Sequence, residues 1–174
     1  DVTEIFEGRA GNDTIDGAGG LDQVRYTNSG AAVSVDLANG TASDGHGATD
    51  TFTNIEGARG SPFADTLLGG LAANGVGVRE GLEFFQGDAG ADTIDGGQGF
   101  DRIQFNASPI GVVVTFTGAG SGTAQDGYGT EDSFFNIEGV RGSDFDDSLT
   151  GSDAGDYEVF EGRMGDDVID GRGG

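Results

Sequence analysis

Aspartates recur in this chain at one fixed position of a nine-residue unit, and their spacing could hold metal ions. Gly8 to Asp16 reads Gly-Arg-Ala-Gly-Asn-Asp-Thr-Ile-Asp, and Gly17 to Arg25 reads Gly-Ala-Gly-Gly-Leu-Asp-Gln-Val-Arg. Both follow the pattern Gly-x-x-Gly-x-Asp-x-apolar-x, which returns as a tandem pair at 87–104 and begins again at 162. Glycine turns can aim backbone carbonyls inward, and one carboxylate per turn adds a charged oxygen. Because calcium takes roughly six to eight oxygen ligands in irregular geometry, whereas magnesium demands a near-octahedral site, the pattern predicts calcium.

The predicted ligands are the sixth residue of each unit and the carbonyl oxygens of its glycines. The aspartates are Asp13, Asp22, Asp92, Asp101 and Asp167, to which two weaker units add Asp65 and Asp147. The glycines are Gly8, Gly11, Gly17, Gly20, Gly87, Gly90, Gly96, Gly99, Gly162 and Gly165. Asp50 and Asp132 have a similar phase without the turn and are further candidates, while Asp44 and Asp126 are expected only to form turns. For any single aspartate, a purely structural role in a turn is the alternative.

Three glutamates and three more aspartates flank these units. Glu4, Glu83 and Glu158 stand one unit before each glycine pair, where the pattern would place an aspartate, but their longer side chains count against ligation. The residues at position nine, which are Asp16, Asp95 and Asp170, are expected to point outward.

The composition limits the possible partners. The 174 residues include 36 Gly, 31 Asp and Glu, and eight cationic residues that are all Arg, so the net charge is −23. Such an acidic surface repels nucleic acid and anionic lipid and attracts hard divalent cations. Because Cys is absent and His46 is the only histidine, disulfides are excluded and a zinc site is disfavoured. The chain has neither an apolar run of membrane-spanning length nor the features of a signal peptide at Asp1.

Glycine content and apolar spacing together predict an all-β fold. No apolar helical period persists, and the apolar residues recur at fixed offsets from the glycines. We therefore expect a right-handed parallel β-roll or β-helix solenoid of about nine coils, with Ca²⁺ in its Gly/Asp-rich turns. The expected inward residues are Phe6, Ile15, Val24, Val35, Phe52, Ile55, Leu67, Phe85, Ile94, Ile103, Val114, Phe134, Ile137, Leu149, Phe160 and Ile169. This core is small for so many glycines, so several bound ions are expected to supply missing stability.

The chain repeats itself on a longer scale within one predicted domain, 1–174. Asn54-Ile-Glu-Gly-Ala-Arg-Gly-Ser61 matches Asn136-Ile-Glu-Gly-Val-Arg-Gly-Ser143. The predicted repeats cover about 6–84 and 85–159, with the start of a third at 160–174. Their length differences fall in glycine-rich stretches at 69–82 and 118–122, which are expected to be loops.

The unit at 96–104, Gly-Gly-Gln-Gly-Phe-Asp-Arg-Ile-Gln, carries a resemblance to a known family. It resembles the RTX family, the haemolysin-type calcium-binding repeats, and the stretch from Val33 to Leu68 is similar to spacers between such nonapeptides in large secreted bacterial proteins. The resemblance implies a roll that is unfolded at low cytosolic calcium and folds outside the cell. It also implies type I secretion from a Gram-negative bacterium. Here, however, the nonapeptides come only in pairs.

Three functions remain open from the sequence. The leading hypothesis is a non-enzymatic calcium-binding module beside other domains of a larger secreted or surface protein. Because the chain starts inside one repeat and ends inside another at Gly174, a self-assembling filament element that stacks through open solenoid ends is the second. The third is an accessory module of a polysaccharide-modifying enzyme, whose ligand would not be acidic unless the arginines share one face. Catalysis is not expected, since His46 has Tyr128 as its counterpart in the other repeat.

Overall fold

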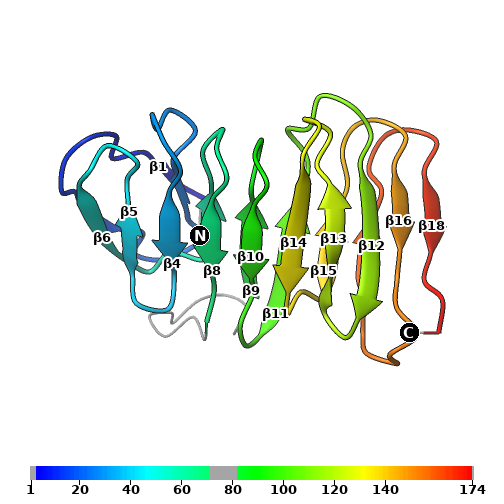
Figure 1. The fold of residues 1–174 in the computed structure, drawn as a ribbon. Helices are drawn as coiled ribbons and strands as arrows, with labels where there is room; N and C mark the ends of the chain where they lie inside the picture. Colours follow the sequence, from blue (N-terminus) through cyan, green and yellow to red (C-terminus); the bar gives the residue numbers. More distant parts are fainter. Residues whose placement is uncertain (1–2, 71–81, 174) are drawn as a thin grey trace.

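Residues 3–70 and 82–173 are described by the structure, a computed structural model. These residues form eighteen short strands in two sheets and no helix, so none of their segments is a helix that could cross a membrane (Figure 1). The predicted all-β class is confirmed. Part of the expected loop at 69–82 lies outside the described residues.

The sheet that we call the short sheet is entirely parallel and keeps the order of the chain. Its strands are β1 (Ile5–Phe6), β3 (Gln23–Arg25), β7 (Gly57–Arg59), β9 (Leu82–Gln86), β11 (Phe100–Gln104), β15 (Gly139–Arg141) and β17 (Val159–Glu161). After each of these strands except β17 the chain crosses to the other sheet and returns, which builds a stack of coils. The predicted parallel roll is therefore present.

The second sheet, the long sheet, has eleven strands. In spatial order they are β2 (Thr14–Asp16), β6 (Thr49–Thr53), β5 (Thr41–Ser43), β4 (Ser34–Asp36), β8 (Thr66–Leu68), β10 (Thr93–Asp95), β14 (Glu131–Phe135), β13 (Ser121–Gln125), β12 (Val113–Gly118), β16 (Ser148–Thr150) and β18 (Val168–Asp170). Two groups, β4–β5–β6 and β12–β13–β14, are antiparallel meanders.

These meanders correct the prediction that every strand is part of a parallel coil. The turns at Asn39-Gly40 and Ala119-Gly120 let the chain fold back on the same face, where an antiparallel strand needs only a short connection. Each meander adds strands to the long sheet alone. The expected nine coils are therefore wrong, because the short sheet has seven strands. The division into repeats at 6–84 and 85–159 stays a prediction, although one meander lies in each.

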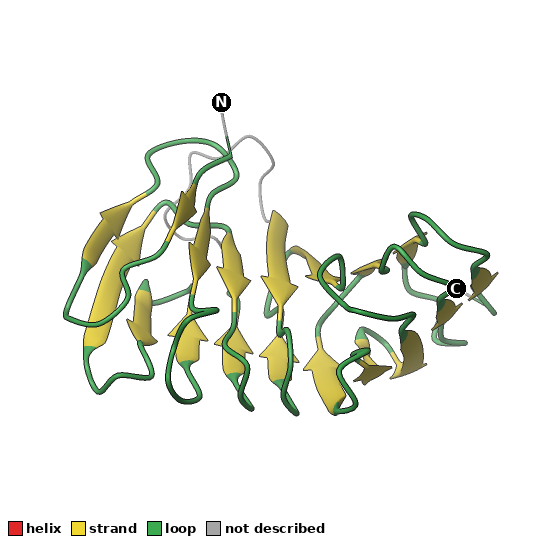
Figure 2. Ribbon diagram, turned by 90° about the horizontal axis from the view of Figure 1, so that it is seen from above, coloured by secondary structure: helices red, strands yellow, loops and turns green. Residues whose placement is uncertain are grey.

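Unequal sheets bend the stack. Neighbouring strands are about 4.8 Å apart in any sheet, so the long sheet must span more distance than the short sheet packed against it. The longer sheet then follows the outside of a curve, and the short sheet lines the inside. Figure 2 shows that the strand direction also rotates from one end of the stack to the other, as expected for twisted sheets.

The core lies between the sheets and confirms most of the predicted inward positions. Val24, Phe85 and Ile103 from the short sheet are buried with Leu67 and Phe134 from the long sheet. Phe6, Ile15 and Phe160 are partly buried against this core. Ile169 shares the inward register of buried Leu149, as predicted, but it is 48% exposed because β18 is the outermost strand of the long sheet. Core residues that the spacing missed include Val33, Phe105, Val112 and Phe116.

Candidate metal centres along the two edges

Acidic residues form a continuous row where the chain turns from the long sheet into the short sheet, which we call the second edge. Strand register stacks the residue two positions before each inward apolar residue on its counterpart in the next coil. The row consists of Glu4, Asp22, Glu56, Glu83, Asp101, Glu138 and Glu158. Seven carboxylates therefore stand one strand spacing apart with no residue of another kind between them.

Hydrogen bonds show how neighbouring coils share this row. The backbone N–H of Glu4 donates to Asp22 Oδ1 at 2.8 Å, and that of Asp22 donates to Glu56 Oε2 at 2.9 Å. The N–H of Asp101 likewise donates to Glu138 Oε2 at 2.9 Å. Each such bond uses one carboxylate oxygen and fixes the side chain under the coil before it. The second oxygen of Asp22 and of Asp101 is left for another partner.

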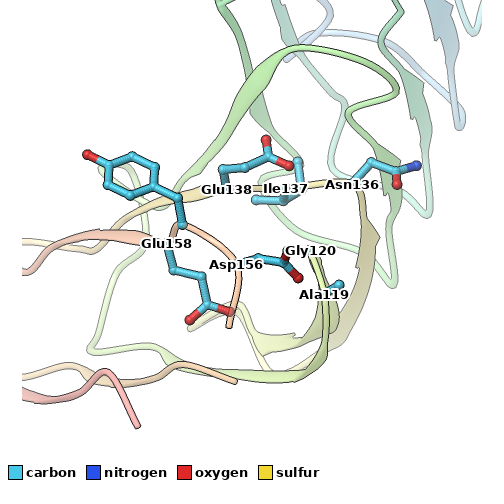
Figure 3. A pocket seen from close by; sticks show the side chains of 8 residues that line it. Ala119, Gly120, Asn136, Ile137, Glu138, Asp156 and Glu158 are labelled. Carbon is cyan, nitrogen blue, oxygen red and sulfur yellow. The ribbon is translucent and has the colours of Figure 1, made fainter. Parts of the chain in front are cut away.

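The last step of the second edge is more open. Glu138 and Glu158 line a hollow of about 300 Å³ together with Asp156, and Figure 3 shows their side chains around it. Ser152 N–H donates to Glu158 at 3.0 Å, which ties one carboxylate to the turn after β16. This end of the row has room for solvent beside a cation.

The opposite turns, from the short sheet into the long sheet, form the first edge. Its row is interrupted and consists of three groups, Asp13–Asp50, Asp65–Asp92–Asp132 and Asp147–Asp167. Within a group the backbone N–H of one aspartate donates to the carboxylate of the next, as between Asp92 and Asp132 Oδ1 at 3.0 Å. At the start of each meander the position next to Asp65 or Asp147 is occupied by Val33 or Val112 instead of an aspartate. Both are core residues and interrupt the row.

In residues 3–70 and 82–173, six carboxylates have a buried oxygen without a hydrogen-bond partner. These atoms are Oδ2 of Asp13, Asp22, Asp92, Asp101 and Asp132, and Oε1 of Glu83. A buried anionic oxygen with no donor is strongly unfavourable, so something absent from the chain itself must satisfy it. Four of the six atoms belong to the sixth residues of the two tandem pairs.

Burial and mutual repulsion raise the pKa of these groups. Burial is the main cause that raises the pKa of Asp101 to about 8, and the charges of Glu83 and Glu138 add to it. Burial raises the pKa of Asp132 to about 8 and that of Asp92 to about 7, where other first-edge aspartates contribute. The pKa of Glu83 rises to about 7 for the same reason. These rows therefore favour protons or cations over free charge.

The donor set fits calcium. A side chain at Gly69 would come within 3 Å of both Glu83 Oε2 and the carbonyl oxygen of Gly96, so two oxygens of different coils face one small space. Gly60 and Gly142 are placed in the same way, against Asp65 with the Gly87 carbonyl and Asp147 with the Gly162 carbonyl. No group of three or more His, Asp or Glu suited to a metal occurs in residues 3–70 and 82–173. Two carboxylates with several carbonyls would suit calcium and leave zinc without ligands.

The predicted ligands are not equivalent in the structure. Asp65 and Asp147 are held by the hydroxyl and N–H of Ser61 and Ser143, which occupy their oxygens. Asp50 accepts from the N–H of Asp13 at 3.0 Å and from the hydroxyl of Tyr26 at 3.1 Å. The carboxylates of these three residues are therefore less available to an ion than those of the tandem pairs.

The remaining candidates occupy their expected turns. Asp167 accepts from the N–H of Asp147 at 3.0 Å and is half-buried. Asp44 and Asp126 accept N–H groups of their own turns, as expected of turn residues. Among the predicted glycines, Gly11, Gly20, Gly90, Gly99 and Gly165 have positive φ, a conformation that glycine adopts at no steric cost.

The sequence prediction missed Glu56 and Glu138 and left Glu83 undecided. All three lie two residues before an inward residue of the short sheet, at Ala58, Val140 and Phe85. Asp22 and Asp101 have the same two-residue offset from Val24 and Ile103. This offset was the available signal, and it does not depend on the glycine turn.

A comparison with protein families agrees with this geometry. A family model described as RTX calcium-binding nonapeptide repeat (4 copies) matches residues 3–26 and 81–104. The chain carries RTX calcium-binding repeats. The matched segments contain both tandem pairs and five of the six carboxylates with an unpartnered oxygen, with Asp132 outside. A search of the curated proteins found no match.

Replacing Gly96 with alanine tests the close packing of an RTX turn. The added Cβ would collide with the backbone oxygen of Asn136 and lie 2.6 Å from Asp101 Cβ. We expect Gly96→Ala to lower the stability of the calcium-loaded roll by about 1–3 kcal/mol, as overpacking does, and to raise the calcium concentration at the folding midpoint. Urea unfolding in calcium measures both effects. Gly19→Ala is the control because nothing lies within 4 Å of its Cβ position, and an equal loss there would contradict the packing argument.

Acidity should act in opposite directions on the two forms of the RTX roll. Since the folded pKa values of Asp101 and Asp132 are raised to about 8, the folded state binds their protons more tightly than the unfolded state does. In calcium-free buffer the residual β structure is expected to increase as pH falls from 8 to 6. In calcium the same change should weaken ion binding, because protons compete for the ligands. Circular dichroism at each pH measures both trends, and parallel trends would contradict the assignment.

Proposed function

We propose that this calcium-binding β-roll is an extracellular structural module of a larger protein, which folds and becomes rigid when Ca²⁺ occupies its two edges. The supporting observation is the set of six buried carboxylate oxygens without partners, which lie in rows along the edges. Without cations, these rows would place like charges one strand spacing apart in a poorly hydrated environment.

Each residue class has a distinct role in this proposal. The tandem-pair aspartates supply charged ligands, and the carbonyls of the turn glycines complete the coordination. Glu56, Glu83 and Glu138 continue the second-edge row through coils that lack a nonapeptide aspartate. Calcium, when bound, supplies the positive charge that links one coil to the next. Stability then accumulates between neighbouring coils, as in other solenoids.

The setting of the module is part of the proposal. RTX repeats are typical of proteins that Gram-negative bacteria secrete, and the resemblance of the spacers supports type I secretion. Folding only at extracellular calcium would keep the chain unfolded during export. We further propose that the module has no catalytic activity of its own; turnover of ester or glycoside substrates by the calcium-loaded chain would contradict this. Self-association through open solenoid ends stays a prediction, to be checked by light scattering in calcium.

The direct test is a comparison of ions by isothermal titration calorimetry. We expect several Ca²⁺ ions to bind and Mg²⁺ to bind at least tenfold more weakly, because magnesium keeps its waters and needs a more regular site. Terbium luminescence in the same samples would report displacement of the probe by calcium. Equal affinities for the two ions, or the absence of binding, would contradict the proposed function.

A further inference from the structure

Arginines gather on the outward face of the short sheet. Arg25, Arg59, Arg102 and Arg141 alternate with inward core residues on β3, β7, β11 and β15, so their side chains leave the roll on one side. They are half of all eight arginines of a chain with a net charge of −23. The described strands of the long sheet contain no arginine.

The outward positions of the five central short-sheet strands contain no acidic residue. Besides the arginines they hold glutamines at 23, 86 and 104, the apolar residues Leu82, Phe84 and Phe100, and two glycines. The two glycines are covered by longer neighbours, since a Cβ at Gly139 would lie 3.1 Å from Arg102 Cγ and one at Gly57 would collide with the Phe84 ring. The result is a strip of guanidinium and amide groups with an apolar part at Leu82, Phe84 and Phe100, between two acidic edges.

This strip lies on the inner side of the bent stack and is hollowed. A cavity of about 200 Å³ is lined by Phe84, Arg102, Gln104 and Arg141, together with Thr3 and Leu21 from the turns before β1 and β3. Residues from both halves of the short sheet thus face one hollow, as the shorter length of this sheet predicts. Concave faces of solenoids are extended surfaces suited to binding long ligands.

The ion pairs of Arg25, Arg59 and Arg141 leave these three arginines of the strip able to change partners. Arg25 pairs with Glu7 at 3.3 Å, Arg59 with Asp88 at 2.7 Å and Arg141 with Glu161 at 3.1 Å. The acidic partners lie at the ends of the strip or in a neighbouring turn, and the Arg25, Arg59 and Arg141 side chains remain 23–35% exposed. Such surface pairs contribute about 0–1 kcal/mol, so a ligand carboxylate can replace them.

We propose that the outward face of the short sheet binds a linear acidic polysaccharide. The planar guanidinium fork matches a carboxylate, and glutamine amides donate to and accept from sugar hydroxyls. The repeat of the strip along parallel strands matches a polymer with a carboxylate on successive sugars. Duplex nucleic acid is disfavoured because its dense phosphates would extend over the acidic edges.

This binding should require calcium, and only this requirement rests on the proposed function. Ions along the edges would cancel the charge that flanks the strip and hold the arginines at their spacing. The ligand face itself uses none of the carboxylates assigned to calcium.

The test uses the whole chain in calcium with a galacturonic acid oligomer too short to form a gel. Titration calorimetry is expected to show binding that is at least tenfold weaker for the methyl ester of the same oligomer, in which the carboxylates are masked. The variant Arg102→Gln/Arg141→Gln should lose at least tenfold in affinity, and Arg172→Gln, off the strip and exposed, should bind like the unchanged chain. Equal binding of the ester, unchanged affinity of the double variant, or no binding would overturn the proposal.

Two further measurements keep the result unambiguous. The calcium titration of the double variant, followed by circular dichroism, should match that of the unchanged chain. A loss of affinity then reports on the ligand face, whereas failure to fold would concern calcium-dependent folding. Arg102→Lys/Arg141→Lys keeps the charge without the fork and should recover only part of the affinity. Single-stranded DNA of equal charge that competes as well as the oligomer would overturn the choice of polysaccharide and point to general anion binding.

Discussion

Chelation of calcium is expected to convert the β-sheet circular dichroism spectrum of this chain into that of a coil, and added millimolar Ca²⁺ is expected to restore it. The apolar core must offset the ordering of 36 glycines, the residue type that loses most conformational freedom on folding. The core must also offset the cost of burying charged carboxylates such as Asp101 and Asp132, whose pKa values burial raises to about 8. Ions that bind only the folded state shift this balance strongly.

The control for this experiment is ionic strength. Sodium chloride screens exposed charges but cannot coordinate buried oxygens, so equal ionic strength without calcium should leave the chain largely unfolded. A sheet spectrum that persists in chelator, or that salt alone restores, would show that ligation is not what stabilises the roll.

Substitution of Asp101 is expected to have the second largest effect. Its carboxylate lies in the middle of the second-edge row, with Oδ1 on the Glu83 N–H at 3.2 Å and Oδ2 unpartnered. Asp101→Asn keeps the size and the first acceptor but removes the charge. In calcium we expect a loss of about 2–3 kcal/mol, which lowers Tm by roughly 5–10 °C for a chain of this size, and a calcium midpoint raised about tenfold.

The same substitution should not destabilise the calcium-free state. Removing one charge from a repelling row relieves part of the repulsion by Glu83 and Glu138. The sign of the effect therefore depends on the ion, which a role in packing alone would not produce.

Asp16→Asn provides the matched control. Asp16 is exposed and already accepts hydrogen bonds from Ala18 N–H and the Asn54 side chain. It should change Tm in calcium by less than about 1 °C, as surface changes usually do. A decrease in Tm for Asp16→Asn as large as that for Asp101→Asn would mean that the net charge of the chain, and not ligation of calcium, controls stability.

Much of the site could be predicted because its pattern is local. The glycine turn, the aspartate at position six and the apolar residue at position eight are set by neighbours within nine residues. This is why Asp13, Asp22, Asp92 and Asp101 were singled out and why their oxygens lack partners in the fold. Asp65 and Asp147 hold the same position in weaker units, in which Phe63 and Phe145 replace the second turn glycine. Only the contacts reveal that the serines at the second turn position occupy the oxygens of these two aspartates.

The sequence by itself determined the parallel roll, its turn chemistry and the class of ion, since these follow from short-range spacing. Only the tertiary structure decided that each spacer folds into an antiparallel meander, because the alternating pattern of β5 and β13 suits both a return beside the preceding strand and a crossing to the other sheet. That choice lengthens one sheet and bends the stack. It also decided that Glu56, Glu83 and Glu138 complete an unbroken acidic row and that four arginines share the concave face, since strand register between coils sets which residues become neighbours.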